Sequence, residues 1–217
     1  RGAIAVWVER ALGASQLATR LREATEEEAS AVDPQVLDTV LCRTIALIDP
    51  RAPMFWRGAA LMPDALGPVL AETVLGRGEH PFDLDDLEEL IDSLAIGRWA
   101  AACGDRYVDP VALERMARQF RVIRRSSALG SGTERLLYLL NPALPCLSPV
   151  LGGRMATTLP ALLRALEEIA PGLPTGALPL DRHIAAFIAV HVDGRLDGEL
   201  AAIEEAGSTA EAAVAAI

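Results

Sequence analysis

The chain has 217 residues, of which 51% are hydrophobic, and a formal net charge of −10. A hydrophobic fraction near one half supports a sizeable buried core and argues against a disordered chain. The negative charge argues against a general binder of nucleic acids or anionic membranes, because both are themselves negatively charged. All 20 basic residues are arginine, so the chain has no lysine for a Schiff base or a phosphate-binding P-loop.

The pattern of apolar residues predicts an all-α fold, an irregular bundle or array of about ten helices without a significant β-sheet. Alanine and leucine are abundant and only 4% of the residues are aromatic, a composition that favours helices over strands. In the first part of the chain we expect helices over 3–12, 15–29 and 62–75. Another opens at Asp33 and Pro34, because proline suits the first helical position.

Two helices of opposite charge are predicted next, in the stretch 82–127. The first covers 83–103, where apolar residues recur at helical spacing and five carboxylates lie in the first turns, next to the positive end of the helix dipole. The second, 109–127, begins with an aspartate as N-cap and a proline after it. It carries five candidate partner- or anion-binding residues: Arg115, Arg118, Arg121, Arg124 and Arg125. A solvated face, or pairing with the acidic helix, is the interpretation we favour for these arginines.

The last third of the chain contains a proline-rich apolar segment between predicted helices. We expect helices over 134–140, 158–170, 183–192 and 196–205, followed by a helix-prone tail. The segment 141–149, with the sequence NPALPCLSP, cannot be helical throughout and is expected to lie extended over the core. It either plugs a groove or lines one, and its candidate groove residues are Tyr138, Asn141, Pro142 and Pro145.

The domain organisation expected is a single helical domain, 1–217, with two possible lobes, 1–128 and 129–217. A start at Arg1 indicates an excerpt of a longer chain. The longest uncharged run, 136–153, is interrupted by three prolines, so no membrane-spanning helix is expected. Three scattered cysteines without a CxxC spacing favour reduced thiols in a cytoplasmic protein.

No catalytic, metal-binding or cofactor-binding motif is present. The three histidines, His80, His183 and His191, lack the spacing of a metal-binding pair on a helix. The turn 130–133, with the sequence GSGT, superficially resembles a phosphate-binding turn, but it follows a helix and an ordinary helix cap explains it equally well. We therefore predict no cofactor and leave catalytic activity open.

From these observations we predict a helical protein-interaction or regulatory module, and we expect its partner to be a protein. One alternative is an enzyme or small-molecule-binding domain of unrecognised type. A second alternative is a nucleic-acid binder that uses the helix 109–127. The acidic helix 83–103 argues against it, because carboxylates repel the phosphate backbone. The oligomeric state and the identity of the partner stay open.

Overall fold

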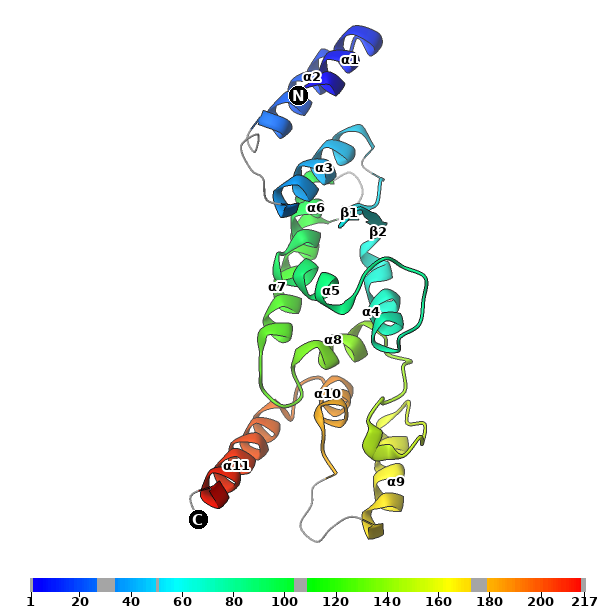
Figure 1. Ribbon diagram of the computed structural model, residues 1–217, viewed down its shortest axis with the longest axis vertical. Coiled ribbons are helices and arrows are strands. Elements are labelled where there is room, and N and C mark those ends of the chain that lie inside the picture. Colours follow the sequence, from blue (N-terminus) through cyan, green and yellow to red (C-terminus); the bar gives the residue numbers. More distant parts are fainter. Residues whose placement is uncertain (1, 27–33, 50, 104–108, 173–178, 216–217) are drawn as a thin grey trace. The chain divides into compact units, whose positions relative to one another are not determined.

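The computed structural model describes residues 2–26, 34–49, 51–103, 109–172 and 179–215. Within these ranges the chain forms eleven α-helices and one two-stranded sheet (Figure 1), which confirms the predicted all-α class. The chain divides into two compact units, Arg1–Arg121 and Val122–Ile217. The division falls a few residues before the predicted lobe boundary at 128.

The first unit holds most of the helices. Its elements are α1 (Ala3–Leu12), α2 (Ser15–Glu26), α3 (Pro34–Ile48), β1 (Met54–Trp56), β2 (Ala59–Leu61), α4 (Leu66–Val74), α5 (Leu84–Asp92), α6 (Ala95–Cys103) and all but the last turn of α7 (Pro110–Arg125). The helix α1 packs on α2, α2 on α3, and α3 on both α6 and β1. The predicted bounds of α1 are confirmed, because Gly13 adopts a left-handed conformation and ends the helix there.

A short β-hairpin follows α3 and was not predicted. Its strands pair antiparallel, with Met54 opposite Leu61 and Trp56 opposite Ala59. The two turn residues, Arg57 and Gly58, both have positive φ angles, 48° and 84°, as a type I′ hairpin turn requires. Three-residue strands are too short to show an alternating pattern, so the sequence gives little warning of this sheet.

The single acidic helix predicted over 83–103 is wrong, because the structure divides it into α5 and α6. Ser93 ends α5, and Leu94 takes a left-handed φ of 58° before α6 begins. The apolar spacing continues through the break, which is why it suggested one helix. The predicted acidic start is confirmed: Asp83 accepts a hydrogen bond from the Asp86 N–H, and Asp86 accepts one from the Asp83 N–H, which together form a capping box.

The helix α7 begins where the sequence predicts. The carboxylate of Asp109 accepts hydrogen bonds from the N–H groups of Val111 and Ala112, both at 3.0 Å. Its buried side includes Ala117 and Phe120. The helix ends at Arg125 rather than at residue 127.

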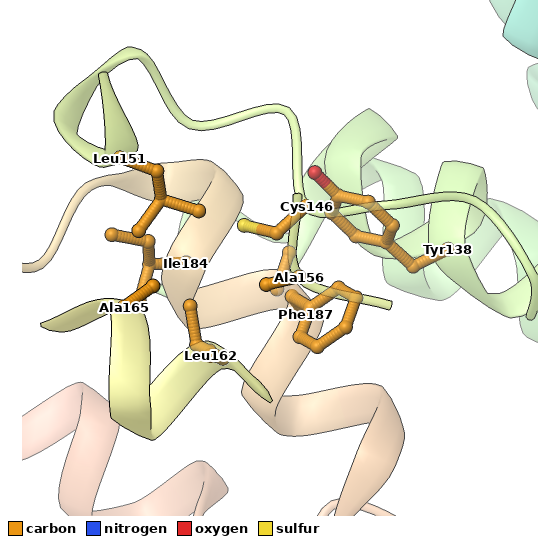
Figure 2. Packing of buried hydrophobic residues seen from close by; sticks show 9 residues of the cluster. Tyr138, Cys146, Leu151, Ala156, Leu162, Ala165, Ile184 and Phe187 are labelled. Carbon is orange, nitrogen blue, oxygen red and sulfur yellow. The ribbon is translucent and has the colours of Figure 1, made fainter. Parts of the chain in front are cut away.

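The second unit is built from α8 (Gly132–Leu140), α9 (Leu159–Ile169), α10 (Arg182–His191) and α11 (Asp197–Ala215). Its main core cluster joins α8, α9, α10 and the proline-rich segment through buried side chains that include Tyr138, Cys146, Leu162, Ile184 and Phe187 (Figure 2). The last helix continues past the predicted end at 205, so the helix-prone tail is helical as far as Ala215.

Candidate interaction surface

The first two helices form a hairpin with a small core between them. This core covers only part of the apolar surface of α1. Ala5 and Val8 of α1 pack against Ala18 and Leu21 of α2, and all four are at most 2% exposed. Gly13 has the left-handed conformation (φ 67°) that reverses the chain between the two helices. The ion pair between Glu9 and Arg22 adds a second link across the hairpin.

The face of α1 next to this buried row is apolar and exposed. Ile4, Trp7 and Ala11 follow each other at i, i+3 and i+7, a spacing that places them on one face of a helix. Trp7 is 59% exposed and Ile4 52%. Together the buried and exposed rows make one apolar stripe that is wider than α2 covers, and such a stripe normally faces a core. Among the described residues, α1 therefore carries apolar surface that its own unit leaves open.

The arginines of α7 differ in their surroundings. Arg115, Arg118 and Arg125 are exposed, whereas Arg121 and Arg124 are half-buried. Arg118 forms an ion pair with Glu114 one turn earlier, at 2.5 Å, and Arg124 and Arg125 also take part in interactions within the chain. Exposed pairs of this kind contribute little to stability. Two large apolar residues, Val111 and Val122, are exposed on the same helix.

The predicted groove residues lie in a segment that covers the core of the second unit. Tyr138 is only 1% exposed, and its hydroxyl accepts a hydrogen bond from the N–H of Leu147 at 2.9 Å. Asn141 donates from its side chain to the carbonyl of Leu137. Pro145 is half-buried and Pro142 exposed. Tyr138 therefore holds the segment down by its hydroxyl, and its ring belongs to the core (Figure 2).

Several polar side chains gather beside this segment. The Tyr138 hydroxyl lies 3.0 Å from Nδ1 of His183, and the Ser148 hydroxyl donates to Asp181 at 2.5 Å. Burial raises the pKa of Tyr138 well above its usual value and also raises the pKa of the Cys146 thiol, so both side chains are neutral near pH 7.

This arrangement does not form a catalytic triad, because Ser148 is bonded to the carboxylate rather than to His183. Asp181 and Ser148 serve as helix caps instead: Asp181 accepts from the N–H of Ile184, and Ser148 accepts from the N–H of Val150. The polar contacts near Tyr138 are therefore structural.

The turn that superficially resembles a phosphate-binding loop has a packing role in the second unit. Gly130 is buried and has a φ of 84°, and a Cβ atom there would come within 2.7 Å of Leu200 Cδ1. Ser131 caps α8 by position only, since its side chain accepts no capping hydrogen bond. A side chain at position 130 would thus strain the positive φ and crowd both Leu200 of α11 and the carbonyl oxygen of Ala185.

The described histidines do not converge on a metal site. His80 Nε2 lies 3.2 Å from the Thr73 hydroxyl, and His191 Nδ1 lies 2.9 Å from the carbonyl of Phe187. In the part of the chain that the structure describes, no group of three metal-ligating side chains comes together.

Comparisons with known proteins do not assign the chain to a family. No family model, no curated protein and no solved structure matches it. Within the described ranges, no helix has the length and apolar character needed to cross a membrane. Sequence reasoning had placed the helix 3–12 but had not singled out its outer face. The run of apolar residues around Trp7 was the available signal.

Proposed function

We propose that the protein is a helical interaction or regulatory module, and that the outer face of α1 docks an amphipathic helix of another protein. The observation that carries this proposal is the exposure of Trp7 and Ile4 on a helix whose adjacent face is already packed against α2. Tryptophan is among the residues that contribute most to binding energy at protein interfaces. An exposed apolar row of two helical turns matches the stripe of a partner helix.

The charges around this face favour a partner with an acidic flank. Arg10, in the last turn of α1, is exposed, whereas the neighbouring Glu9 is neutralised by Arg22. The rim of the face therefore carries a positive charge, which favours a carboxylate beside the apolar stripe of the partner. A lipid surface fits less well, because helices that lie on membranes are rich in basic residues and α1 has one.

We also place the protein in the cytoplasm. Cys42 and Cys146 are buried free thiols, as is usual for proteins of reducing compartments.

The test is a double variant, Ile4→Ser with Trp7→Ser, in a pull-down with a photo-reactive group at position 11. The control is Val111→Ser with Val122→Ser, which removes similarly exposed apolar side chains, 62% and 71% exposed, from α7. All four side chains are exposed, so both variants are expected to fold. We expect one protein in stoichiometric amount with the parent and the control, recovered at least about tenfold less with the double variant.

The crosslink identifies the occupant. We expect it to map to an amphipathic helix with a carboxylate beside its apolar stripe. Recovery unaffected by the double variant would contradict the proposal. So would a crosslink to a second copy of this chain, or binding to lipid vesicles that Ile4→Ser with Trp7→Ser abolishes.

A further inference from the structure

We draw no further inference here: the strongest candidate, the hollow where the turn between α1 and α2 meets the end of α3, is lined by the first turn of α2, by Leu47 and by the exposed side chain of Arg20, and nothing in the structure shows what covers it.

Discussion

The thiol of Cys42 is hydrogen-bonded to both backbone groups of Phe55: Sγ donates to the carbonyl oxygen at 2.9 Å and accepts from the N–H at 3.1 Å. Through these two bonds a side chain of α3 satisfies the N–H and C=O groups of one residue of strand β1. The buried Cys42 thiol thus has a polar role as well as a place in the core.

Replacing this thiol by a methyl group is expected to destabilise the protein. Cys42→Ala leaves two backbone groups of Phe55 without their partner, and we expect a loss of about 1–3 kcal/mol in the free energy of unfolding. Thr44 on the same helix is the control. Its buried hydroxyl has no hydrogen-bond partner, so Thr44→Val is expected to be neutral or stabilising. Urea unfolding measures both, and equal losses would contradict the role of Cys42.

Stability is expected to fall in alkaline solution. Burial raises the pKa of Cys42 and Cys146, so the folded state holds these protons more tightly than the unfolded chain. The stabilisation is complete below the unfolded thiol pKa, about 8.5, and is lost as the pH rises through the folded pKa. The loss is at most about 1.4 kcal/mol per pH unit and thiol. Urea unfolding across this range measures it, and Cys42→Ala is expected to reduce the slope. An unchanged slope would contradict this prediction.

Two glycines with the same backbone conformation are expected to respond differently to alanine. Gly130 and Gly153 have φ angles of 84° and 83°. A Cβ atom at Gly130 would lie 2.7 Å from Leu200 Cδ1 and 3.3 Å from the carbonyl oxygen of Ala185, whereas at Gly153 it meets nothing within 4 Å. Both substitutions strain the backbone by about 1 kcal/mol, and Gly130→Ala is expected to lose about 1–3 kcal/mol more through overpacking.

Thermal or urea unfolding of the two alanine variants gives the difference directly. The double variant Gly130→Ala with Leu200→Ala relieves the contact with the leucine, and is expected to lose less than the two single losses added together. Equal losses at the two glycines would show that α11 does not pack as described.

The helix α7, with its five arginines, is expected to be dispensable for docking at α1 and to bind nucleic acid poorly. The variant Arg118→Ala, Arg121→Ala and Arg125→Ala should retain the partner that Ile4→Ser with Trp7→Ser loses. Fluorescence polarisation with duplex DNA at low and high salt tests the nucleic-acid alternative, because phosphate contacts weaken steeply with salt. Tight, salt-sensitive binding of DNA that the triple variant abolishes would support that alternative. If the triple variant instead loses the protein partner, the docking surface lies on α7.

Local signals in the sequence predicted the helices well. Asp109 and Pro110 predicted the start of α7, because a helix cap is determined by residues within a few positions of it. The sequence around the break at Leu94 contains no such signal. A leucine rarely has a positive φ, and tertiary packing is needed to hold it there.

The candidate sites were predicted less well. That Trp7 lies on a helix can be read from its neighbours, but its exposure depends on which face α2 covers. Asp38, Phe55 and Trp99 line one pocket although they come from three separate elements, and a single sequence does not show which elements meet. The arginines of α7 were conspicuous as a charge cluster, but clustering alone does not distinguish a binding face from a solvated one.

The left-handed turn at Leu94 has a consequence for engineering. It lets α6 begin in a new direction after α5, and α6 packs against α3. A substitution at position 94 that changes the backbone conformation would therefore turn α6 relative to α5 while every buried side chain of the two helices is kept.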